Sequence, residues 1–209
     1  MTVMVPKQKT QSKRGEPVWQ IATLFPTQGN WSEADYLALE TNHLVEFSDG
    51  YVEVLPMPTR FHQAVVAYLY EAFLFFVRPT QLGRVWFAPL PIRLWERKYR
   101  EPDLIFIATE NLDKAKGAYP DGADLVVEVV SGSKKDRDRD LIEKRVEYAQ
   151  AGIQEYWIVD PQQKTITVLS LDESQYVIHG QFDEGSEANS LLLAGFEVSV
   201  TAVFAAANQ

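Results

Sequence analysis

Residues 124–131, DLVVEVVS, constrain the fold more than any other segment, because they are almost wholly apolar and rich in β-branched valine. Such residues favour β-strands, in which successive side chains point to opposite faces. One face of this strand would carry Leu125, Val127 and Val129. The opposite face would carry Glu128 between two valines. A strand that is apolar on both faces is typical of a central strand covered by helices, so the segment predicts an α/β fold with a carboxylate inside it.

Hydrophobic periodicity and turn residues outline the remaining elements. We expect helices over residues 31–40, 60–77 and 136–151. We expect strands over residues 84–94, 101–108, 155–161 and 164–171, and two short β-like runs between residues 176 and 204. Two β-rich runs at residues 43–56 flank Asp49–Gly50, which is a hairpin signal. The pattern predicts a mixed β-sheet flanked by α-helices, with an N-terminal β-hairpin extension.

The chain has 209 residues and no cysteine, and this length buries a sizeable core without disulfides. We expect a single domain over residues 18–209, because no repeat or linker divides it. The polar residues 1–17 are expected to be a disordered tail, with a DNA-contacting arm as the alternative. This tail lacks the apolar core of a signal peptide, and the apolar stretch at residues 64–77 is too short to span a bilayer. A cytoplasmic protein without a membrane partner is expected.

The formal net charge of −9 argues against a surface coated in positive potential, as in a general DNA-binding protein. The charge does not exclude nucleic-acid chemistry. A carboxylate-rich metal site is itself negative, and a bound Mg²⁺ reverses the local field.

A second carboxylate occupies a similar setting in the strand predicted at residues 101–108. Alternation places Asp103 on the face of Ile105 and Ile107. A buried carboxylate is costly unless it is paired, hydrogen-bonded or metal-bound. Two such carboxylates on neighbouring strands suggest one shared cation, and oxygen ligands favour Mg²⁺ or Mn²⁺ over zinc.

The helix at residues 136–151 supplies a third group. Asp140, Lys144 and Tyr148 recur at i, i+4 and i+8 and therefore line one side of the helix. A lysine beside Asp103 and Glu128 would orient or deprotonate an attacking water, or neutralise negative charge on a phosphate. Metal and lysine together suit phosphodiester hydrolysis.

Each of these residues also has an ordinary structural interpretation. Asp140 and Lys144 are at the spacing of a helix salt bridge. Asp103 follows a proline and would simply begin a strand, and Glu128 would pair with a buried arginine such as Arg93. The occurrence of all three groups in the order Asp, Glu, Lys favours the metal site.

The segments REPDLIFIA, DLVVEVVSGS and RDLIEKRVEYAQAGIQEYWIVDP resemble the family of putative bacterial restriction endonucleases within the PD-(D/E)XK nuclease superfamily. The resemblance extends from the hairpin at residues 43–56 to about Phe204. It implies a restriction-endonuclease-like core, with Asp103 and Glu128 as metal ligands. Val130 occupies the position where a simple E-x-K motif has lysine, and the resemblance implies that Lys144 from the next helix replaces it.

The resemblance adds Glu46 and His62 as accessory residues, beside Asp140. Glu46 lies in the hairpin and would be a third carboxylate. His62 lies near the start of a long helix, whose positive end disfavours an imidazolium. A neutral His62 would accept a proton or contact phosphate, and the alternative is a histidine with a structural hydrogen bond. His43 and His179 have no supporting spacing.

The sequence therefore predicts a Mg²⁺- or Mn²⁺-dependent endodeoxyribonuclease that cleaves DNA. One alternative is a catalytically inactive DNA- or protein-binding module of the same fold, and another is a nuclease subunit that needs a partner protein. A homodimer is expected, because cutting both strands commonly needs two sites and two-fold dimers are common. The apolar run at residues 191–207 is a candidate dimer surface.

Overall fold

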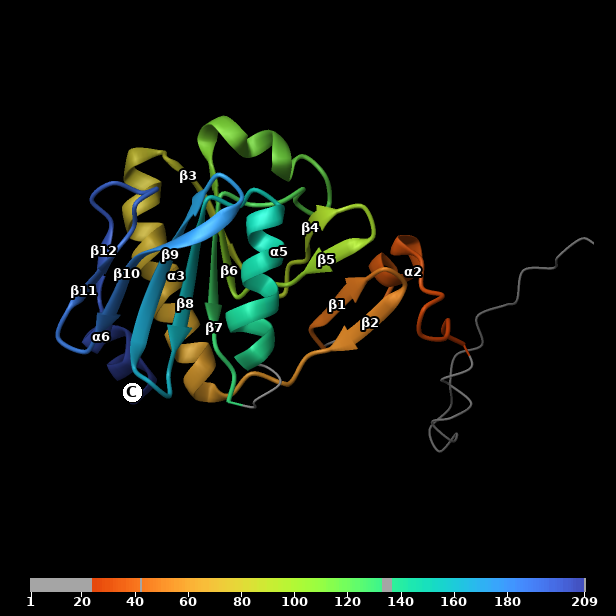
Figure 1. Cartoon of the computed structure of the whole chain (residues 1–209), viewed down its shortest axis with the longest axis horizontal. Coiled ribbons are helices and arrows are strands. Elements are labelled where there is room, and N and C mark those ends of the chain that lie inside the picture. Colours follow the sequence, from red (N-terminus) through yellow and green to blue (C-terminus); the bar gives the residue numbers. More distant parts are fainter. Residues whose placement is uncertain (1–23, 42, 133–136, 209) are drawn as a thin grey trace, which may run out of the picture.

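The structure, a computed structural model, describes residues 24–41, 43–132 and 137–208. The predicted tail at residues 1–17 lies outside the described residues. A six-stranded sheet forms the centre of the molecule, with α3 and α5 on its opposite faces (Figure 1). The prediction of a mixed α/β fold is confirmed.

The strands of the central sheet follow the order β10-β9-β8-β7-β6-β3. Strand β7 is the predicted central strand, and it is parallel to β8 but antiparallel to β6. All five of its residues are buried, as expected for a strand covered on both faces. The strands are β3 (Gly83–Phe87), β6 (Leu104–Ala108), β7 (Leu125–Val129), β8 (Glu155–Asp160), β9 (Thr165–Asp172) and β10 (Gln175–Asp183).

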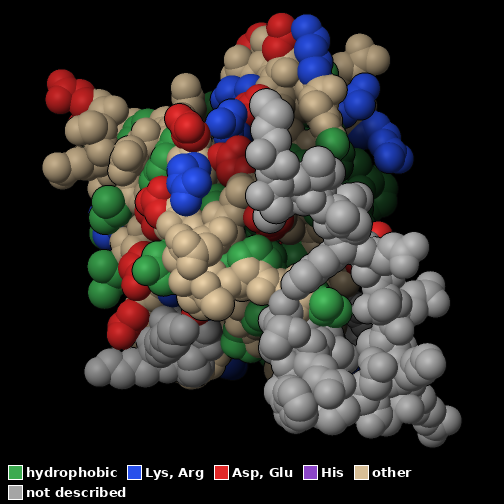
Figure 2. Space-filling view, turned by 90° about the vertical axis from the view of Figure 1, so that its right-hand side faces the viewer, with side chains coloured by type: hydrophobic (Ala, Val, Ile, Leu, Met, Phe, Trp, Pro, Cys, Tyr) green, Lys and Arg blue, Asp and Glu red, His purple; other side chains and the backbone are tan. Residues whose placement is uncertain are grey.

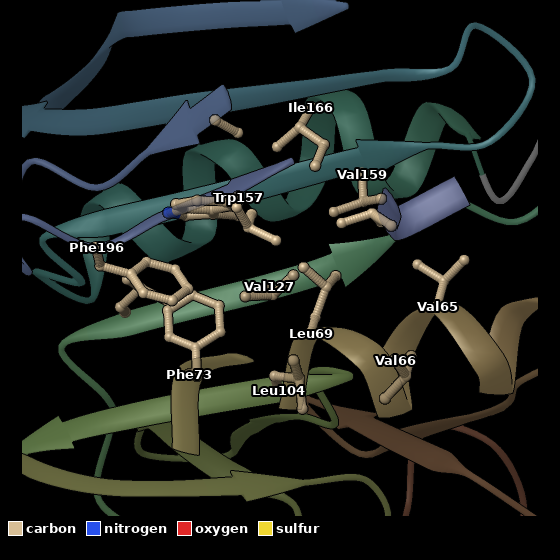
Figure 3. Close-up of a cluster of buried hydrophobic side chains, with 14 of the residues drawn as sticks. Val65, Val66, Leu69, Phe73, Leu104, Val127, Trp157, Val159, Ile166 and Phe196 are labelled. Carbon is tan, nitrogen blue, oxygen red and sulfur yellow. The ribbon is translucent and has the colours of Figure 1, made fainter. Parts of the chain in front are cut away.

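One face of the sheet packs against α3 (Arg60–Thr80) and the C-terminal part of the chain. Figure 3 shows Phe73 of α3 against Trp157 of β8 and Phe196, and the Phe73 and Phe196 ring centroids are 4.2 Å apart. The C-terminal elements are β11 (Glu187–Asn189), β12 (Glu197–Ser199), α6 (Val200–Ala205) and a 3₁₀ turn (Ala206–Asn208), where the sequence predicted only two β-like runs between residues 176 and 204.

The C-terminal apolar run therefore contributes mainly to the core. Val200 and Phe204 are 0% and 4% exposed, and among the larger apolar side chains of this run Leu191 is the one that is well exposed. The interpretation of this run as a dimer surface is wrong, because α3 and the sheet already cover it.

The other face of the sheet packs against α5 (Lys144–Gln150), which continues from a π-helical turn at Arg139–Glu143. Of the helix predicted over residues 136–151, the described residues 137–150 form one continuous helical segment with a wider first part. Such π-helical turns often occur at functional sites. Gly152 follows with a φ of 73°, a left-handed conformation that suits the predicted glycine at the helix end.

A second, four-stranded sheet has the order β2-β1-β5-β4. The predicted hairpin is confirmed as β1 (Val45–Ser48) and β2 (Tyr51–Val54), and Asp49 and Gly50 have φ of 47° and 90°, as a type I′ turn requires. The hairpin is more than an extension, because β1 also pairs with β5. The other elements of this region are α2 (Glu33–Leu37), β4 (Ile92–Trp95) and β5 (Lys98–Arg100).

The prediction of one strand over residues 84–94 is wrong, because this segment forms β3 and β4 in different sheets. Pro89 and Pro91 separate the two strands. Proline lacks the N–H that a strand ladder requires, and the chain turns from one sheet to the other there. The connection at residues 109–122 contains a 3₁₀ helix at Thr109–Ala115. Among the described residues, no helix combines the length and hydropathy needed to cross a bilayer.

Replacing Leu69 by alanine is expected to lower the free energy of unfolding by about 2–5 kcal/mol. Leu69 is 0% exposed in α3 and belongs to the core between this helix and the sheet. Phe75→Ala on the same helix is the control, because Phe75 is 76% exposed and its loss should change stability by less than about 0.5 kcal/mol. Urea unfolding of both variants makes the comparison, and equal losses would contradict the packing.

Candidate active site

Three of the predicted acidic residues, Asp103, Glu128 and Asp140, line one small pocket of about 30 Å³. It lies where the start of β6, the end of β7, the start of α3 and the π-helical turn come together. A volume of this size holds one water or one cation. Its walls include His62, Glu101, Asp103, Glu128, Arg139, Asp140 and Lys144.

The register of β6 and β7 places Asp103 directly across from Glu128. Leu104 pairs with Val127 in this antiparallel ladder, so the preceding residue of one strand lies opposite the following residue of the other. Both side chains lie on the α5 face of the sheet, as alternation predicts. The backbone N–H of Val129 also donates to Asp103 Oδ2 over 2.8 Å.

Glu128 receives two hydrogen bonds on one carboxylate oxygen. Lys144 Nζ donates to Glu128 Oε1 over 2.7 Å, and the Tyr148 hydroxyl donates to the same atom over 2.6 Å. The alternative that Glu128 pairs with Arg93 is wrong, since Arg93 lies near Glu33 and Asp121. Burial raises the pKa of Glu128, and the Asp140 and Asp103 carboxylates add to the rise while Lys144 opposes it.

Lys144 is 1% exposed and is surrounded by carboxylates from three elements. Its Nζ lies 2.7 Å from Glu128 Oε1, 3.3 Å from Asp140 Oδ1 and 3.4 Å from Glu46 Oε1. Burial alone would lower the pKa of Lys144, but the charges of these three carboxylates raise it above its ordinary value. The side chain is therefore an ammonium ion and a hydrogen-bond donor.

His62 faces Asp103 at the start of α3. Its Nε2 lies 3.1 Å from Asp103 Oδ2, and the Thr59 side chain caps the helix by accepting from the His62 N–H over 3.1 Å. Burial lowers the pKa of His62, but the hydrogen bond and charge of Asp103 raise it above its ordinary value. The Asp103 carboxylate thus opposes the effect that the sequence analysis expected from the helix end.

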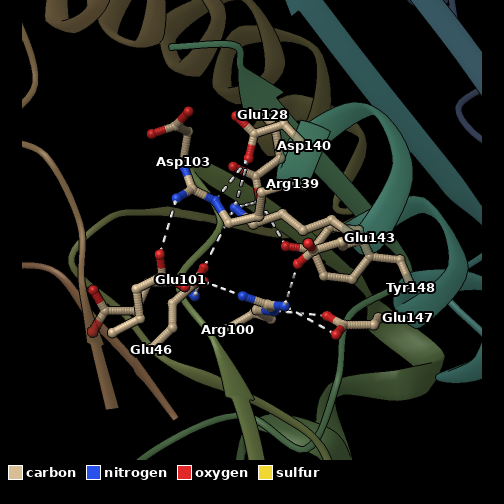
Figure 4. Close-up of polar contacts among 12 residues, drawn as sticks. Glu46, Arg100, Glu101, Asp103, Glu128, Arg139, Asp140, Glu143, Glu147 and Tyr148 are labelled. Atoms are coloured by element: carbon tan, nitrogen blue, oxygen red, sulfur yellow. Dashed lines mark hydrogen bonds and ion pairs between the residues drawn. The ribbon is translucent and has the colours of Figure 1, made fainter. Parts of the chain in front are cut away.

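A second layer of charges connects this pocket to the four-stranded sheet. Arg100 of β5 binds Glu46 of β1, and its Nε donates to Glu147 Oε2 of α5 over 2.7 Å. Lys98 of β5 also pairs with Glu147. Figure 4 shows Arg100 and Glu147 at one end of this network and Glu128 and Asp140 at the other.

The structure thus brings together all six residues that the sequence singled out: Glu46, His62, Asp103, Glu128, Asp140 and Lys144. Sequence reasoning missed the roles of Arg100, Lys98 and Glu147. A signal was available, because Lys98 and Arg100 are cations at alternate positions of one short strand. Glu147 is three residues after Lys144, one helical turn along α5.

The chemistry of the pocket fits a small divalent cation held by few protein ligands. Among the described residues, no group of three or more His, Cys, Asp or Glu side chains is arranged as a metal cage. Mg²⁺ does not require one, since it keeps several waters and commonly binds only one or two carboxylates. Asp103 and Glu128 supply two carboxylates on facing strands, at the wall of a pocket that holds one small ion. The residues present therefore fit such an ion.

Comparisons with known proteins point to nucleases. Residues 33–201 match the model of the Uma2 family, described as putative restriction endonuclease. The chain is similar to a solved structure of a putative nuclease belonging to DUF820 from Anabaena variabilis ATCC 29413, with 19% sequence identity and a TM-score of 0.69. The similarity covers 85% of this chain and 99% of that chain, and at this identity it shows the fold alone. A comparison with curated proteins finds no match.

Glu46→Gln is expected to destabilise the protein at pH 7 and to have less effect in acid. Burial would raise the pKa of Glu46, but Lys144 and Arg100 lower it to about 2, below the ordinary value of 4.5. A lowered carboxyl pKa stabilises the fold above the unfolded-state pKa, and this contribution disappears as the pH falls towards the folded-state pKa. We expect a loss of up to roughly 3 kcal/mol at pH 7.

Urea unfolding at a series of pH values between 7 and 3 measures this difference between wild type and Glu46→Gln. The difference in free energy of unfolding between the two proteins should be constant near neutral pH and should become smaller below about pH 5. A gap that is independent of pH would show that the ion pairs of Glu46 do not stabilise the fold.

Proposed function

Because the chain belongs to the Uma2 family of putative restriction endonucleases, we propose that it is a Mg²⁺- or Mn²⁺-dependent endonuclease that hydrolyses phosphodiester bonds of DNA. The observation that carries this proposal is the position of Lys144. The Lys144 ammonium lies 2.7 Å from the Glu128 carboxylate. Glu128 of β7 lies opposite Asp103, which directly precedes the neighbouring strand β6. Two carboxylates and one lysine at the edge of a central sheet are the groups that metal-assisted hydrolysis of a phosphodiester requires.

In this proposal Asp103 and Glu128 hold the cation. A bound Mg²⁺ supplies positive charge beside the scissile phosphate. Both carboxylates are held in position before any substrate arrives. His62 and the Val129 N–H hold Asp103. Lys144 and Tyr148 hold Glu128. Such preorganisation reduces the reorganisation that the reaction requires.

Lys144 acts as a donor rather than as a base, because its raised pKa keeps it protonated. An ammonium beside the carboxylates would orient the attacking water and stabilise negative charge that develops on the phosphate. Asp140 and Glu46 are accessory residues that fix the ammonium between them. They place the positive charge without touching the phosphate.

His62 is a second candidate donor. The His62 side chain is hydrogen-bonded to Asp103, which raises its pKa. As an imidazolium it would contact a phosphate oxygen or donate a proton to the leaving oxygen. This role differs from the proton acceptor that the sequence suggested. It makes His62→Gln a variant with reduced activity and an intact metal site.

The inactive binding module is the competing function, and the small number of candidate metal ligands among the described residues favours it. Calorimetric titration with Mn²⁺ separates the two. Binding that is lost in Asp103→Asn supports the nuclease, and no heat up to millimolar Mn²⁺ supports the module. A nuclease subunit that needs a partner would bind Mn²⁺ and cleave DNA only after addition of cell extract.

The homodimer remains a prediction, which light scattering would test.

Plasmid cleavage in Mg²⁺ or Mn²⁺ is expected to fall by at least about 100-fold in Asp103→Asn and in Glu128→Gln. Both substitutions keep the side-chain shape and remove a carboxylate that the cation needs. Lys144→Met should reduce cleavage to a similar extent, since it removes the donor and leaves buried carboxylates unpaired.

Asp113→Asn is the matched control, because Asp113 is a carboxylate on the 3₁₀ helix that is 84% exposed. Its cleavage rate should equal that of the wild type. Circular dichroism of every variant checks that the fold is retained. Full activity in folded Asp103→Asn and Glu128→Gln would rule out this assignment of the site.

A further inference from the structure

A second pocket, of about 230 Å³, adjoins the carboxylate site. The two pockets share residues at their common wall, including His62 and Asp103. The remainder of the second pocket is mainly apolar and includes Met57, Val66, Phe87, Ala88 and Pro89. An apolar pocket that opens beside a charged site requires an explanation of its own.

Phe87 is the exposed aromatic residue of this pocket. It is the last residue of β3, and its side chain is 53% exposed. Tyr70 of α3 contacts the ring edge-on, with centroids 4.8 Å apart and planes at 70°. The ring is therefore held in place while part of its surface remains open. Met57, at 66% exposure, provides a second exposed apolar side chain at this pocket.

We propose that this pocket binds one unpaired nucleobase of the DNA strand whose phosphate lies at Asp103 and Glu128. The proposal rests on the nuclease function proposed above. A base is attached to its phosphate through one sugar, so a phosphate at His62 and Asp103 brings a neighbouring base to the pocket that shares this wall. The flat apolar face of the base would stack on Phe87, and the Gln63 side chain would contact its polar edge.

The occupant is an unpaired base rather than a base pair. In a duplex both faces of each base are covered by stacking, so an aromatic side chain reaches a base only when the base is unstacked. A pocket of about 230 Å³ is small for a ligand site and accommodates one base more readily than a pair.

The charge of the molecule supports the same choice. Binding along a duplex depends on many phosphate contacts from Lys and Arg, and the chain has a formal charge of −9. On the face in Figure 2, Lys and Arg side chains are interspersed with Asp and Glu instead of forming one continuous basic surface. The inferred substrate class is therefore DNA with unpaired nucleotides, such as single strands, flaps or frayed ends.

Binding of a labelled single-stranded oligonucleotide tests the proposal by fluorescence anisotropy, with Ca²⁺ in place of Mg²⁺ to prevent cleavage. The wild type should bind the single strand more tightly than the duplex of the same sequence. Phe87→Ala should weaken binding of the single strand by roughly 5- to 100-fold, the loss expected when one base is no longer stacked. Phe87→Trp should restore it.

Phe75→Ala is the matched control, since Phe75 is an exposed phenylalanine of α3 that does not line this pocket. A series of oligonucleotides with one abasic site at each position in turn provides a second control. At the position that occupies the pocket, wild-type binding should weaken, and Phe87→Ala should cause no additional loss.

Equal binding by Phe87→Ala and Phe75→Ala would overturn the proposal, as would equal losses on single strand and duplex. A change in oligomeric state of Phe87→Ala with unchanged DNA binding would instead identify an interface between copies, and would also overturn it. Glu128→Gln separates this outcome from failure of the nuclease. If cleavage depends on Glu128 while binding and cleavage are unchanged in Phe87→Ala, the nuclease function is supported and the base pocket is refuted. If single-strand binding depends on Phe87 while Glu128→Gln cleaves like the wild type, the assignment of the catalytic site is refuted and the base pocket is retained.

Discussion

One buried ammonium ion fixes how three parts of the molecule meet. Lys144 of α5 lies between carboxylates of β1, β7 and the π-helical turn, and these contacts tie three parts of the molecule to one point. Burying this charge alone would be very unfavourable, and so would burying the carboxylates without it. The ammonium and the carboxylates therefore each reduce the free-energy cost of burying the other. Removing one partner of such a pair typically costs about 3–5 kcal/mol. The same arrangement holds the residues of the proposed reaction in place.

Arg100 extends this constraint to the second sheet. By binding Glu46 of β1 and Glu147 of α5, it joins the hairpin region to the helix that carries Lys144. The hairpin is thus part of the site, because Glu46 of β1 contacts both Arg100 and Lys144. A buried cluster of this kind gives little net stability compared with apolar packing, but its geometry leaves few alternative arrangements. Catalysis in this proposal requires a single arrangement of the cluster, because the cation and the lysine must face the same phosphate.

Much of the site followed from local patterns. Strand alternation put Asp103 on the face of Ile105 and Ile107 and Glu128 on the face between two valines. Helical spacing put Asp140, Lys144 and Tyr148 on one side of α5. The errors have physical causes. The segment at residues 84–94 reads as one apolar strand, and the prolines that divide it between two sheets were given too little weight. The raised pKa of His62 depends on Asp103, which is 41 residues away in the chain and adjacent only after folding.

The sequence by itself determined the elements and the faces on which their side chains lie, because strand and helix periods are properties of the local backbone. These periods predicted the covered central strand, the helix that packs against it and the carboxylate of Glu128 within an apolar strand. Only the tertiary structure decided the partners. The register of β6 against β7, the pairing of β1 with β5 and the convergence on Lys144 are contacts between distant segments. Such contacts follow from how the covered faces pack, which no local period specifies.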